Sequence, residues 1–127
     1  MLIPKALHYT KNHLWLRPVG FSEYFIGITH FAQKQIGAIS CITLDLQCGI
    51  LEKNLPLGRI DSASGAFALI APVEGTIIAA NTTLNHTPSN INEAPYTNWI
   101  LRIAVNRHIP ISELLNHEEY QKLTNDY

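Results

Sequence analysis

Short apolar runs recur along this chain at intervals of about 8 to 12 residues, with turn-forming residues between them. The clearest run alternates apolar and polar residues from Ile42 to Gln47, as a half-buried strand requires. This spacing is typical of an all-β sandwich or barrel in which helices are accessories. We predict seven strands: Leu14–Val19, Glu23–Thr29, Ile42–Gln47, Leu57–Asp61, Ala66–Ile70, Thr76–Ala80 and Trp99–Val105.

Two helices are predicted beside these strands. The first covers Phe31–Ile36, because Thr29 is a good N-cap and Gly37 a good C-cap, and Phe31, Ala32 and Ile36 should face the core. The second lies beyond Pro110, where Asn116 and Glu119 have the spacing of a capping box. The polar stretch 81–92 is predicted to be a long loop, and Trp15 and Trp99 to fill the core between the sheets.

The composition limits the classes of function. The 127 residues fit one domain, residues 1–127, and the formal net charge of -1 without a basic cluster argues against nucleic acid as a partner. The apolar runs are too short to cross a membrane, and with no recognisable targeting segment we expect a cytoplasmic protein. We expect Cys41 and Cys48 to be reduced, and the six histidines lack the spacing of a metal site.

Five motifs, in order, resemble those of the H proteins of the glycine cleavage system. The family patterns are Y-T-x-x-H-E-W, V-G-I-T-x-x-A-Q-x-x-L-G, A-P-V-x-G, N-x-x-P-Y…W and E-L-L…E-E-Y. The matching segments are Tyr9 to Trp15, Ile26 to Gly37, Ala71 to Gly75, Asn92 to Tyr96 with Trp99, and Glu113 to Leu115 with Glu118 to Tyr120. The resemblance extends over about residues 9–123. It implies a barrel-sandwich hybrid, a mainly β fold of two packed antiparallel sheets with a short internal helix and a helical C-terminus.

The resemblance also implies a carrier and not an enzyme. In the family, a lysine on a hairpin tip is amide-linked to lipoate. The lipoyl arm carries an aminomethyl group between glycine decarboxylase, aminomethyltransferase and dihydrolipoyl dehydrogenase. Only a primary amine forms a stable amide with the lipoyl carboxyl group, and the dithiol of lipoamide then carries the group.

This chain departs from the family at that tip. The family reads G-x-x-E-S-V-K and then A-x-x-D, whereas Ser64 stands in the lysine position here. The other tip positions are Asp61, Ser62, Ala63 and Gly65. Two carboxylates that would hold the cationic amine of a loaded arm are replaced by Leu14 and Ala68, so both the attachment point and its cradle are lost.

We therefore predict a divergent H-protein-like chain that cannot be lipoylated at Ser64 and needs no cofactor. It would act as a non-catalytic binding or regulatory module whose partners are glycine cleavage components or a lipoylation enzyme. One alternative is a working carrier lipoylated on another lysine, such as Lys53, Lys34 or Lys11. A small serine or thiol enzyme is a weaker alternative, because Ser62 to Gly65 is not the G-x-S-x-G elbow of hydrolases.

Overall fold

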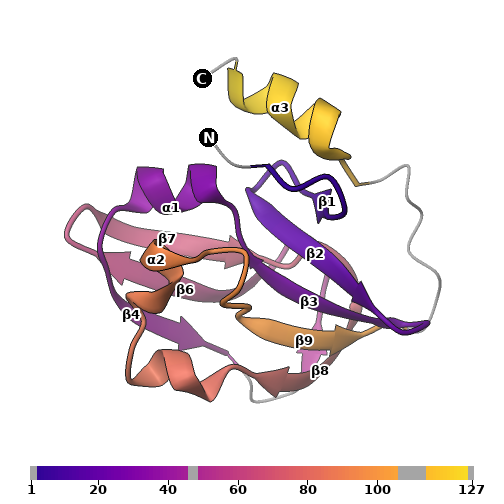
Figure 1. Cartoon of the computed structure of the whole chain (residues 1–127). Coiled ribbons are helices and arrows are strands. Elements are labelled where there is room, and N and C mark those ends of the chain that lie inside the picture. The colour runs from indigo at the N-terminus through magenta and orange to yellow at the C-terminus, as the bar shows by residue number, and fades with distance from the viewer. Residues whose placement is uncertain (1–2, 46–48, 106–113, 126–127) are drawn as a thin grey trace.

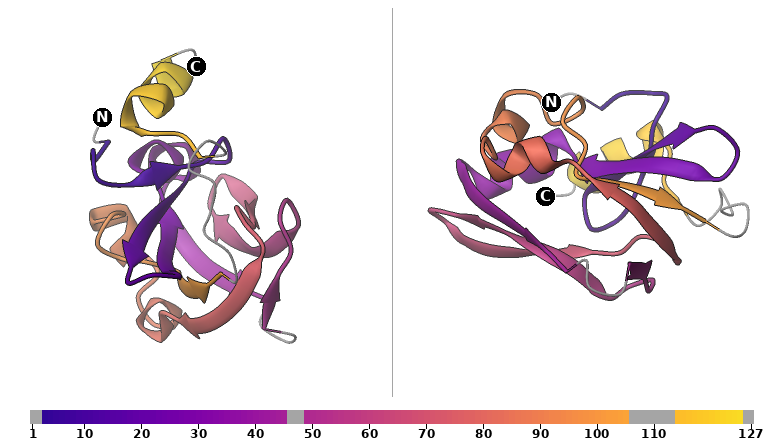
Figure 2. Two further views of the ribbon diagram at one scale, coloured as in Figure 1. Left: turned by 90° about the vertical axis from the view of Figure 1, so that its right-hand side faces the viewer. Right: turned by 90° about the horizontal axis from the view of Figure 1, so that it is seen from below.

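The computed structural model describes residues 3–45, 49–105 and 114–125. Two antiparallel sheets pack face to face, and the right-hand view of Figure 2 shows them as separate layers. The larger sheet has the strand order β1-β2-β3-β9-β8-β5 and the smaller one β4-β6-β7. The strands are β1 His8–Tyr9, β2 Leu14–Val19, β3 Glu23–Ile28, β4 Ile39–Leu44, β5 Ile50–Leu51, β6 Pro56–Ser62, β7 Gly65–Ile70, β8 Gly75–Ala80 and β9 Leu101–Ala104.

The helices cover the ends and one side of this sandwich (Figure 1). They are α1 His30–Ile36, the 3₁₀ helix η1 Thr82–Asn85, α2 Asn90–Glu93 and α3 His117–Asn125. Both predicted caps of α1 are confirmed: the Thr29 side chain accepts a hydrogen bond from the Ala32 N–H at 3.2 Å, and Gly37 has a φ of 79°. The capping box of α3 is confirmed as well, since Asn116 and Glu119 exchange hydrogen bonds of 3.1 and 2.8 Å.

The main core lies between the sheets and comes from the alternating residues of the strands. In β2, Leu14 and Leu16 face this core, while Trp15 between them faces the opposite side. Trp15 is fully buried there with Tyr9 and Tyr120, beneath α3. The prediction that Trp15 and Trp99 fill the space between the sheets is therefore wrong, because the C-terminal helix creates a second core on the outer face of the larger sheet.

The strand predicted at Ile42–Gln47 begins earlier than expected. β4 starts at Ile39, because its register with β6 pairs Ile39 with Ser62 and Leu44 with Gly58. The predicted alternation still holds within β4, where Ile42 is half-buried and its neighbours Cys41 and Thr43 are exposed. The predicted strand residues Leu46 and Gln47 lie outside the described residues, as does Cys48, while Cys41 is a free thiol.

The long loop predicted at residues 81–92 is also wrong. The segment contains η1 and the start of α2, each a single turn of four residues. Leu84 and Ile91 fix these turns by burying their side chains in the main core. Turns this short are stabilised by tertiary packing and not by helix propensity, so the polar composition of the segment concealed them.

Candidate functional site

The hairpin of β6 and β7 carries the candidate site at its tip. Ser62 pairs with Gly65, and Ala63 and Ser64 form a two-residue turn between them. Gly65 has a φ of 135°, a conformation that side-chain-bearing residues rarely adopt, and this allows the tight reversal. Ala63, Ser64 and Gly65 are all exposed, so the serine hydroxyl is accessible at the tip.

The tip is tied to the C-terminal end of α1. The Ser62 hydroxyl donates a hydrogen bond of 2.8 Å to the carbonyl oxygen of Ile36 and accepts one of 3.1 Å from the Ser64 N–H. The Ser64 side chain also lies beside Gly37, because a Cβ added at that glycine would be 3.8 Å from the Ser64 Oγ. The turn is therefore held by its own side chains against a helix end.

Asn92 fixes the segment to which the tip is tied. Its Nδ2 donates to the carbonyl oxygen of Gly37 at 2.6 Å, and its Oδ1 accepts from the Ile39 N–H at 2.9 Å. The Ser40 hydroxyl adds a hydrogen bond of 3.0 Å to the carbonyl oxygen of Asp61 on the hairpin. In the sequence, Asn92 stands out only as part of a family motif. Nothing there predicts that its side chain would join the backbone of Gly37 to that of Ile39.

The outer face of the smaller sheet begins directly below the tip. Asp61 pairs across the strands with Ala66, and Arg59 pairs with Ala68, so these four side chains share one exposed face. Arg59 Nε lies 3.3 Å from the Asp61 carboxylate. Because the Arg59 side chain is 62% exposed, this ion pair adds little stability and mainly orients the two charges.

The two positions predicted to replace the arm cradle have different environments. Leu14 is only 2% exposed and belongs to the main core, while Ala68 is exposed on β7, where Phe67 and Leu69 on either side of it face the core. Neither side chain is charged or polar. These residues therefore cannot neutralise a cationic amine.

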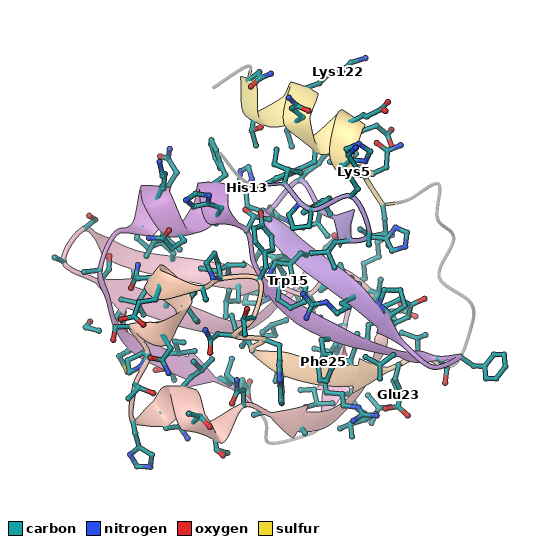
Figure 3. All side chains as sticks on the ribbon, viewed as in Figure 1. Lys5, His13, Trp15, Glu23, Phe25 and Lys122 are labelled. Carbon is teal, nitrogen blue, oxygen red and sulfur yellow. The ribbon has the colours of Figure 1, made fainter. Side chains whose placement is uncertain are left out.

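Thr29, the N-cap of α1, is connected to the C-terminal helix. The Tyr120 hydroxyl lies 2.6 Å from the Thr29 Oγ1 and 2.8 Å from the His13 Nδ1. Figure 3 shows His13 between α1 and α3, where its ring also packs on Phe31 at 4.6 Å between centroids. Burial lowers the pKa of His13, since the charged imidazolium is poorly solvated there.

The aromatic residues of the larger sheet form a support on its outer face. Phe25, labelled with Trp15 in Figure 3, lies 4.8 Å from Trp99 between ring centroids, and the Arg17 guanidinium lies 4.8 Å from the Trp15 ring. The Trp15 indole N–H donates to the carbonyl oxygen of Pro95 at 3.1 Å. This set fixes the segment that leads from Asn92 to β9.

The chemistry of the tip does not fit a lipoyl group. Ser64 has a hydroxyl group and no amine, so it cannot form the amide to lipoate that the family resemblance implies. Within the part of the chain that the structure describes, neither a histidine nor a carboxylate hydrogen-bonds to the Ser64 hydroxyl. Across residues 3–45, 49–105 and 114–125, no three His, Cys, Asp or Glu side chains are placed to hold a metal ion.

The lysines that could replace the tip residue lie elsewhere. Lys34 is exposed in the last turn of α1, Lys53 is exposed in the turn before β6, and Lys11 is exposed in the turn before β2. None of them is in a two-residue hairpin turn such as the one that presents Ser64.

In the described residues, no helix is long and apolar enough to span a membrane.

Comparisons with known proteins agree with this architecture. The family model for the glycine cleavage H-protein matches residues 7–127. The glycine cleavage system H protein of Bacillus cytotoxicus is 36% identical over 126 residues, which cover 98% of both chains. That of Bacillus anthracis is 35% identical, with the same coverage.

A solved structure has the same fold. The crystal structure of a glycine cleavage system H protein from Mycobacterium marinum superimposes with a TM-score of 0.85 at 25% identity, covering 97% of this chain and 99% of that one. The predicted barrel-sandwich hybrid, mainly β with a short internal helix and a helical C-terminus, is confirmed.

Proposed function

Since the chain belongs to the glycine cleavage H-protein family, we propose that it is a cytoplasmic, non-catalytic binding or regulatory module that keeps the carrier shape without carrying lipoate. The observation that carries the proposal is Ser64 at the hairpin tip, in the position that the family resemblance assigns to the lipoyl lysine. A hydroxyl there offers a ligase no amine.

Two further features support the loss of the carrier role. Leu14 is buried among apolar side chains and Ala68 has no polar group, so the positions of the two cradle carboxylates are both apolar. A loaded arm would bring a cationic amine to this region and find no anionic partner in either position. The attachment position therefore lacks an amine, and the two cradle positions lack a carboxylate.

The family membership indicates which proteins would be the partners. H proteins act by docking on the other components of the glycine cleavage system, and this chain presents a hairpin whose tip is held by side-chain hydrogen bonds. We expect it to bind glycine decarboxylase, aminomethyltransferase, dihydrolipoyl dehydrogenase or a lipoylation enzyme through the tip residues Asp61, Ser62, Ala63 and Gly65. Binding without modification would let it compete with a loaded carrier.

The test is the intact mass of the protein purified from cells that contain a lipoyl ligase and added lipoate, with an unaltered H protein expressed alongside as a positive control. We expect the control to gain one lipoyl group and this chain to keep its unmodified mass. A lipoyl group on this chain would overturn the proposal, and peptide mapping would then identify Lys53, Lys34 or Lys11 as the acceptor.

The matched variant is Ser64→Lys, which supplies an amine at the exposed tip without disturbing the core. If the variant gains a lipoyl group while the parent chain does not, the missing amine alone explains the difference. A variant that stays unmodified would show that Asp61, Ala63 and Gly65 have also removed recognition by the ligase.

A further inference from the structure

The smaller sheet has one open edge, along β7. This strand is the outermost one of the sheet and is hydrogen-bonded to β6 (Figure 1). The Asp45 N–H donates to the Leu57 carbonyl oxygen at 2.9 Å, so the odd-numbered residues of β6 bond to β4 and the even-numbered ones to β7. Ala66 and Ala68 pair with odd-numbered residues, so their backbone N–H and C=O groups point away from β6. In residues 3–45, 49–105 and 114–125, no other strand pairs with them.

The other described edges are short or partly covered. β1 and β5 have two residues each, and Tyr9 of β1 exchanges hydrogen bonds of 2.8 Å with Leu115. β4 is covered at its start, where the Ile39 N–H donates to the Asn92 side chain. β7, by contrast, has six residues and contains neither a charge nor a proline. Proteins usually shorten, charge or cover such an edge, because its unpaired backbone groups can pair with another chain.

The open edge of β7 is complementary to itself. An antiparallel arrangement about a two-fold axis at Phe67 places Ala66 of each copy opposite Ala68 of the other. Both alanines direct their backbone groups outward, so each pair would exchange two hydrogen bonds. The same axis places the two Phe67 residues opposite each other, with Cα atoms about 4.5 Å apart. Phe67 is half-buried against the main core, so the contact would cover more of its ring and form an aromatic pair.

The charges on the outer face of the smaller sheet favour the same axis. Asp61 pairs with Ala66 and Arg59 pairs with Ala68, so a row across the joined sheets runs from Asp61 over two alanines to Arg59 of the second copy. The ends of this row are about 14 Å apart, or three strand spacings, so their attraction favours the register without a direct contact. A two-fold axis at Ala68 would instead place Arg59 of both copies at the ends of one row, where they repel.

We infer that β7 pairs with β7 of a second copy of this chain, which joins the two three-stranded sheets into one sheet of six strands. Backbone hydrogen bonds provide the contact, the Phe67 pair lies on its two-fold axis, and the charges of Arg59 and Asp61 set the register. A contact along a single strand edge is small for a protein interface, so we expect a weak dimer with a Kd of about 0.1 mM. The inference does not depend on the chemistry at Ser64.

The test is sedimentation equilibrium of the full chain from about 10 µM to about 1 mM, combined with hydrogen exchange measured by NMR at both ends of this range. We expect the mass to rise from that of a monomer toward that of a dimer. Exchange at the Ala66 and Ala68 amides should slow at the higher concentration, relative to the Phe67 amide that already faces β6. A chain that stays monomeric at about 1 mM would overturn the inference and leave the edge to a strand of a different protein. A dimer in which these two amides stay unprotected would overturn it as well.

Two matched double variants test the register. Ala66→Lys with Ala68→Lys places lysines opposite each other in both pairs and should raise the Kd by roughly tenfold, whereas Ala66→Lys with Ala68→Glu places opposite charges there and should keep the dimer. Ala68→Pro removes an outward N–H that β6 does not use, so it should also raise the Kd by roughly tenfold. Both positions are exposed, and circular dichroism would verify that the variants fold. Equal dimerisation of the two double variants, or an unchanged Kd in Ala68→Pro, would contradict the inference.

Discussion

Replacing Tyr120 with phenylalanine tests how the C-terminal helix is attached to the rest of the fold. The change keeps the ring, which stacks on Tyr9 at 4.7 Å with an interplanar angle of 8°. It removes only the hydroxyl, which lies 2.6 Å from the Thr29 Oγ1 and 2.8 Å from the His13 Nδ1. Thr29 is fully buried, so water cannot replace the lost partner there.

The expected loss follows from these two contacts. A lost hydrogen bond costs about 1 kcal/mol, and a buried polar group without a replacement partner costs up to about 3 kcal/mol. Since Thr29 still accepts from the Ala32 N–H, we expect Tyr120→Phe to lower the free energy of unfolding by about 2 to 3 kcal/mol. An unfolding entropy of roughly 0.27 kcal/mol/K for 127 residues converts this into a fall in Tm of about 7 to 11 °C.

The assay is thermal unfolding followed by circular dichroism near neutral pH. Tyr24→Phe is the matched control, because Tyr24 is also buried, at 8% exposure, but lies on β3 away from this network. A double-mutant cycle with Thr29→Val separates the hydroxyl contact from the N-cap and should give a coupling of about 1 kcal/mol. A fall in Tm for Tyr120→Phe no larger than that for Tyr24→Phe would refute the reasoning.

Three further perturbations test other parts of the structure. Gly27→Ala should lower the free energy of unfolding, measured by chemical denaturation, by about 1 to 3 kcal/mol, because the added Cβ would lie 2.4 Å from the buried Trp15 ring. An unchanged free energy of unfolding would mean that the ring can shift. Asn92→Ala should lower the free energy of unfolding by about 2 kcal/mol and speed hydrogen exchange at the Ile39 amide. Asn92→Asp keeps an oxygen that accepts from the Ile39 N–H, so hydrogen exchange at that amide should be slower than in Asn92→Ala. Burial lowers the pKa of His13 below the value of about 6.5 that it has in the unfolded chain. As the pH falls, the unfolded state therefore takes up the proton first, and the free energy of unfolding should decrease below about pH 6.5. His13→Asn removes this titration while tolerating the positive φ of 65°, so its Tm should depend less on pH over that range, and an unchanged slope would assign the effect to other groups.

The sequence predicted the hairpin tip well because the relevant signals are local. A short polar segment with a glycine, Ser62 to Gly65, separates two apolar runs, and such segments form tight turns whatever packs around them. The contacts that hold the tip were not predictable in the same way. Asn92 is 55 residues from Gly37 in the chain, and no local pattern indicates that its amide would span the link between α1 and β4.

The position of Trp15 was not predictable for a related reason. Trp15 has the pattern of a core residue, but which of the two cores it occupies depends on where α3 packs. That helix begins about 100 residues later in the chain and does not affect the local alternation.

The anchoring of the tip bears on how a partner would bind it. Ser62 and Asn92, which make two of these contacts, both occupy positions of the family patterns, so the anchoring does not depend on which residue stands at position 64. Here Ser62 joins the turn to α1, Ser40 joins the hairpin to β4, and Asn92 fixes the link between that helix and that strand. A turn fixed in this way loses little conformational entropy when a partner closes around it. The rigid tip is therefore a favourable surface for a partner that recognises it directly, as the proposed binding role requires.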